Sequence, residues 1–129
     1  MFSKSKLMKL PRNISIGHSV IQDTPEFCED LNLRGTLLII TGPKTRKIAG
    51  EEVAQLLEKN GYETKIVEVN EPNYEEVENS ERIAKSNEAD FLIGVGGGKT
   101  IDIAKVSASE LNLPFVSFPT ATSHDGIAS

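Results

Sequence analysis

A run of glycines followed by a lysine and a threonine holds the residues best suited to chemistry. Glycine occupies positions 94 and 96–98, and Lys99 and Thr100 follow directly. Glycine has no Cβ to keep a ligand away from the backbone, and the free N–H groups at a helix start bind anions. A lysine ammonium and a threonine hydroxyl beside those groups can reach phosphate oxygens. The run therefore predicts a loop that binds a phosphate or pyrophosphate; a tight turn without a ligand is the alternative.

The two common phosphate-binding motifs do not fit this run. The Walker A loop requires a glycine five residues before Gly98, and that position is Ile93. The dinucleotide fingerprint G-x-G-x-x-G fails at Ile101 when it starts at Gly96, and at Lys99 when it starts two residues earlier. The loop is therefore expected to bind phosphate in another way.

A second cluster of polar side chains follows the last apolar segment of the chain. Its hydroxyl groups belong to Thr120, Thr122 and Ser123, and His124 and Asp125 come next. Such hydroxyls can bind a diphosphate or a nicotinamide ribose, although they can equally satisfy one another in a Ser/Thr turn. His124 taken alone is more typical of a partly exposed loop histidine than of a ligand. The expected position opposite the glycine run favours ligand binding by the hydroxyls.

Alternating apolar strands and amphipathic helices must position both clusters. Buried strands are predicted at residues 36–41, 63–69, 90–94 and 114–118. Helices are predicted between them and at 20–31, and a short edge strand at 13–17. This order at βαβ spacing predicts an α/β fold: one parallel sheet with helices on both faces. Ligands of such sheets bind at the carboxyl edge of the strands. The loops expected at that edge are 42–45, 96–100 and 120–126.

Length and composition indicate one ordinary globular domain. The chain has 129 residues, a formal net charge of −5 and a single cysteine, Cys28. The negative charge argues against nonspecific binding to nucleic acid or to an anionic membrane. One cysteine excludes an internal disulfide, and no apolar run is long enough to insert into a membrane. We therefore predict a cytoplasmic protein in which Cys28 is a small buried apolar residue.

The glycine run continues into a pattern that resembles a known family. Residues 96–105 read G-G-G-K-T-I-D-x-A-K. They resemble the cofactor loop of the superfamily of iron-containing alcohol dehydrogenases, glycerol dehydrogenases and dehydroquinate synthases. With P-T-A-T-S-H-D-G at 119–126, the resemblance is greatest to the glycerol-1-phosphate dehydrogenase branch. It covers nearly the whole chain and implies a Rossmann-like NAD(P)-binding domain over residues 1–129, the first domain of a two-domain enzyme.

The resemblance also implies a reaction and a role for each matching residue. Enzymes of this branch reduce dihydroxyacetone phosphate to sn-glycerol 1-phosphate, a backbone of polar lipids, with NAD(P)H and a metal such as zinc. Asp125 is implied as the substrate-binding residue, and the metal ligands are expected beyond residue 129. The implied cofactor-binding residues are Gly96, Gly97, Gly98, Lys99, Thr100, Asp102, Thr120, Thr122, Ser123 and Ser129.

Two further expectations concern charges near the cofactor. Asp102 is expected in the first helical turn, where it would orient the loop or a sugar hydroxyl. Gly42 and Pro43 stand where many NAD-specific members of the family carry an acidic residue, and Lys44 and Arg46 follow without a carboxylate. Because a lysine or an arginine accommodates the 2′-phosphate of NADP and a carboxylate repels it, NADP(H) should be accepted alongside NAD(H).

Several alternatives stay open at this point. A glycerol dehydrogenase or a dehydroquinate-synthase-like enzyme uses the same scaffold, and a nucleotide-binding module without catalysis belongs to a different class. The 129 residues are interpreted as a fragment rather than as a short natural protein. The fragment alone is expected to bind no catalytic zinc and to show no turnover. The oligomeric state is left open, and a homo-oligomer is permitted.

Overall fold

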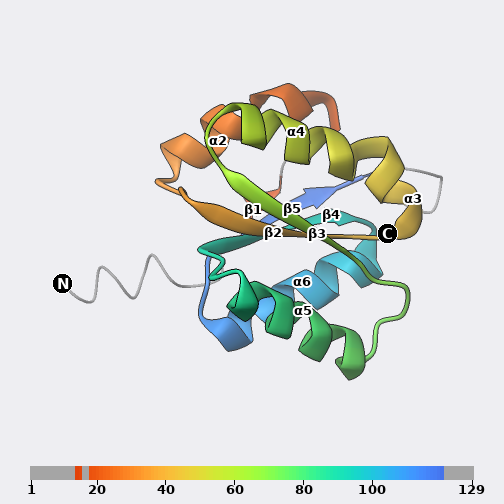
Figure 1. Ribbon diagram of the computed structural model, residues 1–129. Coiled ribbons are helices and arrows are strands. Elements are labelled where there is room, and N and C mark those ends of the chain that lie inside the picture. The colour runs from red at the N-terminus through yellow and green to blue at the C-terminus, as the bar shows by residue number, and fades with distance from the viewer. Residues whose placement is uncertain (1–13, 16–17, 121–129) are drawn as a thin grey trace.

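A five-stranded parallel sheet organises the chain. The computed structural model describes residues 14–15 and 18–120. The strands follow the spatial order β1-β5-β4-β2-β3, and every neighbouring pair is parallel (Figure 1). Their bounds are β1 Ile14–Ser15, β2 Thr36–Thr41, β3 Glu63–Glu68, β4 Phe91–Gly96 and β5 Phe115–Pro119. The α/β class predicted from the sequence is therefore confirmed.

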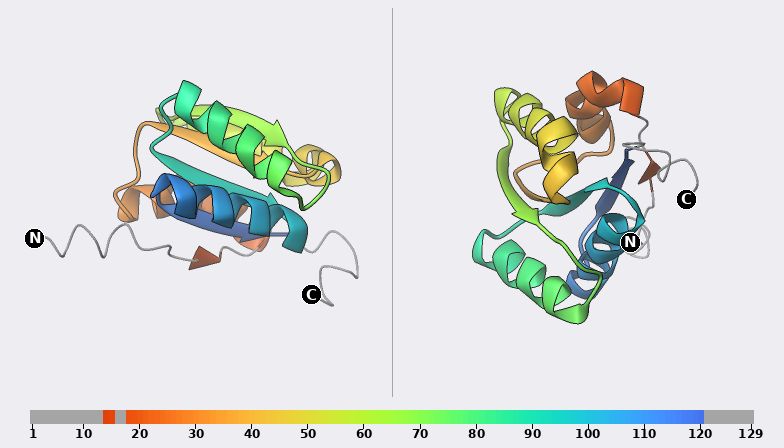
Figure 2. Two further views of the ribbon diagram at one scale, coloured as in Figure 1. Left: turned by 90° about the horizontal axis from the view of Figure 1, so that it is seen from below. Right: turned by 90° about the vertical axis from the view of Figure 1, so that its right-hand side faces the viewer.

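Helices cover both faces of this sheet. One face carries η1 (His18–Asp23), α2 (Thr24–Asp30) and a helical run made of α3 (Pro43–Thr45), the π-helical η2 (Arg46–Gly50) and α4 (Glu51–Lys59). The other face carries α5 (Tyr74–Ser86) and α6 (Gly98–Leu111), which lie side by side beneath the strands (Figures 1 and 2). No helix within the described ranges is long and apolar enough to span a bilayer.

β2 and β4 contribute buried side chains to the core on both faces of the sheet. Side chains of a strand alternate between its faces, so Leu37 and Ile39 pack toward α4 while Leu38 and Ile40 pack toward α5 and α6. All four are at most 1% exposed. A strand buried on both sides reads as a continuous apolar run, which is why these strands could be recognised in the sequence.

The structure moves two predicted boundaries at the carboxyl edge. β4 extends to Gly96 rather than ending at residue 94, because Val95 and Gly96 continue the ladder with Phe118 and Pro119. Residues 42–45 were predicted as a loop, but helix α3 already begins at Pro43. A proline is favourable at a first helical position because its missing N–H would lack a partner there anyway.

A pair of carboxyl groups joins α5 to α6. Tyr74 donates a hydrogen bond of 2.8 Å from its hydroxyl to Glu110 Oε1. Glu81 lies on the same helix as Tyr74, and its carboxyl group interacts with that of Glu110. Burial, followed by the interaction with Glu110, raises the pKa of Glu81 to about 7, whereas the interactions with Glu81 and Tyr74 lower the pKa of Glu110. Glu81 therefore keeps its proton to a higher pH than an ordinary glutamate.

Replacing Glu81 by glutamine is expected to flatten the pH dependence of stability. Because the folded-state pKa is raised, the folded chain binds more protons than the unfolded chain between about pH 4.3 and 7, so stability falls as the pH rises through this window. Glutamine loses no proton, so the drop in Tm of the whole protein between pH 5 and pH 8 should shrink. The exposed Glu75 on the same helix is the control, and an equal change in Glu75→Gln would contradict the assignment.

Candidate functional site

Two neighbouring strands send their connections to opposite faces of the sheet. β2 and β4 pair directly, with Ile40 beside Gly94 and Thr41 beside Val95. The chain leaves β2 into the helical run that ends in α4, and it leaves β4 into α6 on the other face (Figure 1). Such a divergence opens a crevice at the carboxyl edge, where ligands of open α/β sheets bind.

Close packing explains why two of the positions beside this crevice are glycine. A Cβ on Gly94 would lie 2.9 Å from the Cβ of Ala104, so glycine lets α6 pack closely on β4. Gly96 has φ +152°, and a Cβ there would lie 3.1 Å from Thr45 Oγ1. Neither glycine needs a ligand to explain it.

Packing does not explain why residues 97 and 98 are glycine. A Cβ added to either residue would meet nothing within 4 Å, and both are exposed. Gly97 caps α6 in an extended conformation, with φ −87° and ψ −170°, that any residue can adopt. Glycine at these two positions therefore leaves room for a molecule from outside the protein to contact the backbone. A ligand at the helix N-terminus is the occupant that this open cradle fits.

Lys99, Thr100 and Asp102 lie on the same helix in different settings. Lys99 is exposed at the second position of α6, and Thr100 is buried at the third. Asp102 is the fifth residue and exposed, so its prediction for the first turn is wrong. A carboxylate beyond the first turn repels an anion at the helix start less than one within that turn. The first hydrogen bond within the helix runs from the Ile101 N–H to the Gly97 carbonyl. The N–H groups of the helical residues before Ile101 therefore have no partner within the helix.

A threonine that the sequence analysis did not single out ties the two loops together. Gly42 donates its N–H to Thr45 Oγ1 at 3.0 Å, and Thr45 Oγ1 donates to the Val95 carbonyl at 3.2 Å. The hydroxyl of Thr41 lies 2.8 Å away. Thr45 is 6% exposed, so this hydroxyl links the end of β2 to the end of β4 inside the protein.

Thr120 is the described part of the second polar cluster. Its N–H donates to the Gly96 carbonyl at 3.2 Å, so it lies beside the glycine run as predicted. Thr120 is 4% exposed, and its hydroxyl has no hydrogen-bond partner among the described residues. A buried hydroxyl in this position suits a ligand oxygen. Thr122, Ser123, Asp125 and Ser129 lie outside the described residues, and so does His124.

The structure corrects the charge expected around Arg46. Its guanidinium Nε lies 3.2 Å from Glu51 Oε2, and Nη1 lies 3.1 Å from Glu68 Oε2. Residues 42–46 themselves carry no carboxylate, but Glu51 of α4 and Glu68 of the neighbouring strand β3 bring two carboxylates to Arg46. Lys44 is exposed beside it.

Other groups of the described residues offer no reaction centre. Cys28 is fully buried, and burial raises the pKa of its thiol to about 12, so it is a poor nucleophile. Within residues 14–15 and 18–120, no group of three or more histidine, cysteine or acidic side chains could hold a metal ion.

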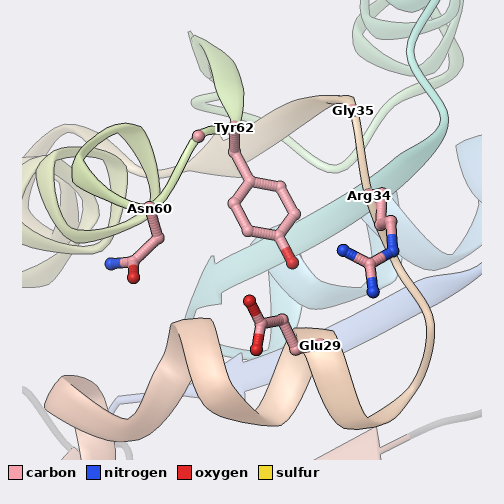
Figure 3. A pocket seen from close by; sticks show the side chains of 6 residues that line it. Glu29, Arg34, Gly35, Asn60 and Tyr62 are labelled. Atoms are coloured by element: carbon pink, nitrogen blue, oxygen red, sulfur yellow. The ribbon is translucent and has the colours of Figure 1, made fainter.

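A small pocket lies at the opposite, amino edge of the sheet. Figure 3 shows Glu29, Arg34 and Asn60 around Tyr62, whose hydroxyl donates to the Leu33 carbonyl at 2.6 Å. Its volume of ≈ 60 Å³ is far below the range of about 300–1,000 Å³ typical of ligand sites. The carboxyl edge therefore stays the candidate site.

The chain is similar in sequence to known dehydrogenases. The chain is 45% identical over 127 residues to a glycerol-1-phosphate dehydrogenase (NAD(P)+) of Methanosarcina mazei, across 98% of this chain and 36% of that protein. It is 43% identical to the enzyme of the same name from Halobacterium salinarum, across 100% of this chain and 37% of that protein. The chain thus spans little more than a third of the length of these curated relatives.

Solved structures share the fold. A glycerol dehydrogenase from Schizosaccharomyces pombe matches 86% of this chain and 29% of its own, with a TM-score of 0.73 and 20% identity. The NADH-dependent butanol dehydrogenase A of Thermotoga maritima matches 75% of this chain and 25% of its own, with a TM-score of 0.64 and 28% identity. A sequence profile described as iron-containing alcohol dehydrogenase matches residues 15–129. The chain belongs to the iron-containing alcohol dehydrogenase family.

Proposed function

We propose that this chain is the NAD(P)-binding part of an enzyme that reduces dihydroxyacetone phosphate to sn-glycerol 1-phosphate and catalyses the reverse reaction. The open cradle at Gly97 and Gly98, at the point where the connections of β2 and β4 diverge, is the observation that carries the nucleotide assignment. The substrate assignment is supported by relatives at 43% and 45% identity that are named for this substrate.

The residues of this chain bind and orient the cofactor. The N–H groups at the start of α6 hold the pyrophosphate, and the Lys99 ammonium neutralises part of its charge. Thr120, with Thr122, Ser123 and Ser129 following in sequence, supplies hydroxyls for the nicotinamide half. Asp125 accepts a hydrogen bond from a hydroxyl group of the substrate. When bound, the nicotinamide would supply the hydride for reduction of the substrate carbonyl.

The metal of this family is assigned to another part of the protein. The described residues contain no ligand set for it, so no step of the chemistry is derived through a metal here. We infer that the ligands, for zinc as the expected ion, come from a second domain outside residues 1–129. The protein that contains both parts is proposed to act in the cytoplasm.

Metal removal is expected to separate binding from catalysis. The whole protein should oxidise NADPH or NADH in the presence of dihydroxyacetone phosphate, and dialysis against a chelator should abolish this turnover. The dissociation constant for the nucleotide should stay within about twofold, because the α6 N-terminus needs no metal to bind a phosphate. Nucleotide binding without any turnover before dialysis would instead support a non-catalytic module. Turnover with glycerol but not with the phosphorylated substrate would support a glycerol dehydrogenase.

A further inference from the structure

The ion-paired arginine at the start of η2 lies near the proposed nucleotide site. Arg46 bonds through two different nitrogens to Glu51 of α4 and to Glu68, the last residue of β3. Glu68 pairs with Thr41, the last residue of β2, so it lies at the carboxyl edge directly beside the turn at Gly42. The carboxylate that the sequence lacks after β2 is thus supplied by the neighbouring strand.

The strand order places this pair where the adenosine half of a cofactor lies. The pyrophosphate is assigned to α6, which follows β4. Thr120 and the proposed substrate-binding residue Asp125 follow β5 in the sequence, and β5 lies on one side of β4. The nicotinamide must lie on the β5 side to reach the substrate, so the adenosine extends across β2 toward β3. β3 lies two strand spacings from β4, or roughly 10 Å, and the adenosine half of a dinucleotide can cross that distance.

The pair remains accessible to a ligand. The side chains of Arg46 and Glu68 are 37% and 39% exposed, and Arg46 and Glu51 also line an open groove between α4 and β3. An ion pair of this exposure contributes little to stability, so a competing anion can displace one carboxylate at small cost. The two ion pairs therefore hold the Arg46 guanidinium in position and leave it accessible to a ligand.

Resting on the proposed function, we propose that Glu68 sets the preference between NAD(H) and NADP(H) by competing for Arg46. With NAD, the Glu68 carboxylate accepts a hydrogen bond from the ribose 2′-hydroxyl while it remains paired with Arg46. With NADP, the guanidinium turns to the 2′-phosphate, and the nearby negative charge of Glu68 weakens that contact. One Arg–Glu pair thereby serves both cofactors.

Glu68→Gln tests this directly in the whole protein. The dissociation constant for NADP should fall roughly fivefold, and that for NAD should stay equal or rise, because the amide neither repels a phosphate nor holds Arg46 by charge. The gain for NADP should shrink at high salt. Arg46→Ala should weaken NADP binding more than NAD binding. Glu63→Gln is the matched control, since it removes the same charge from an exposed residue at the other end of β3.

The outcomes separate the inference from the proposed function. An unchanged ratio of the two dissociation constants in folded Glu68→Gln would overturn the role of Glu68, and so would an equal shift in Glu63→Gln. If valine at Gly97 abolishes binding of both cofactors in the same assay, the nucleotide site itself stands. If valine at Gly97 leaves binding intact, the nucleotide site is wrong, and the role of Glu68 fails with it.

Discussion

Replacing Gly97 by valine is expected to abolish nucleotide binding and leave the protein folded. A Cβ at Gly97 meets no protein atom within 4 Å, and the residue has an extended conformation that valine adopts readily, so the free protein tolerates the change. A pyrophosphate seated on the α6 N-terminus would collide with the added methyl groups. Charge-assisted hydrogen bonds contribute about 1.5–3 kcal/mol each, so losing them should weaken binding at least 100-fold, or by about 2.7 kcal/mol.

Calorimetric titration of the whole protein with NADPH measures this loss. Gly98→Val should behave in the same way, since its Cβ position is equally open. Ser109→Val, exposed near the far end of α6, adds similar bulk away from the crevice and should bind normally. Unchanged affinity in a folded Gly97→Val protein would refute the phosphate-binding loop.

The same substitution three residues earlier is expected to damage the fold. In Gly94→Val, the added Cβ would lie 2.9 Å from the Ala104 Cβ and 3.3 Å from both Ile101 Cδ1 and Phe115 Cε1. A side chain here must push α6 away from β4, and overpacking of this kind costs about 1–3 kcal/mol and sometimes more. We expect Gly94→Val to destabilise the protein by about 3 kcal/mol, with nucleotide binding lost through the fold.

A double-mutant cycle isolates the contact responsible. Gly94→Ala adds only the Cβ, whose nearest neighbour is the Ala104 Cβ at 2.9 Å, and Ala104→Gly removes that opposing Cβ at the usual helix cost of about 1 kcal/mol. In urea unfolding, the double variant should be more stable than the sum of the single changes predicts, because residues in contact couple. Additive changes would show that the approach of α6 to β4 does not explain this glycine.

Most of the fold could be predicted from the sequence because its signals are local. Apolar runs such as residues 37–40 predict strands that are buried on both faces, and the glycine run predicts the loop after β4. The sequence could not separate the roles of the glycines. Gly94 faces a helix and Gly97 faces open space, and only the packing of α6 distinguishes the two.

The parts that were missed depend on contacts between distant segments. Thr45 reaches the Val95 carbonyl across fifty positions of sequence, so no local pattern marks it as a link between two loops. Arg46 meets Glu68 only because β3 pairs with β2, and the loop therefore looked free of carboxylates in the sequence. Asp102 was misplaced by less than a turn, because the helix start could not be located within the glycine run.

A crystal structure of the whole protein with bound NADPH tests the central claim most directly. The claim predicts pyrophosphate oxygens within about 3 Å of the backbone nitrogens of Gly98 and Lys99, with the adenosine extending across β2 toward Arg46. A pyrophosphate bound elsewhere, with no contact to the N-terminus of α6, would contradict it.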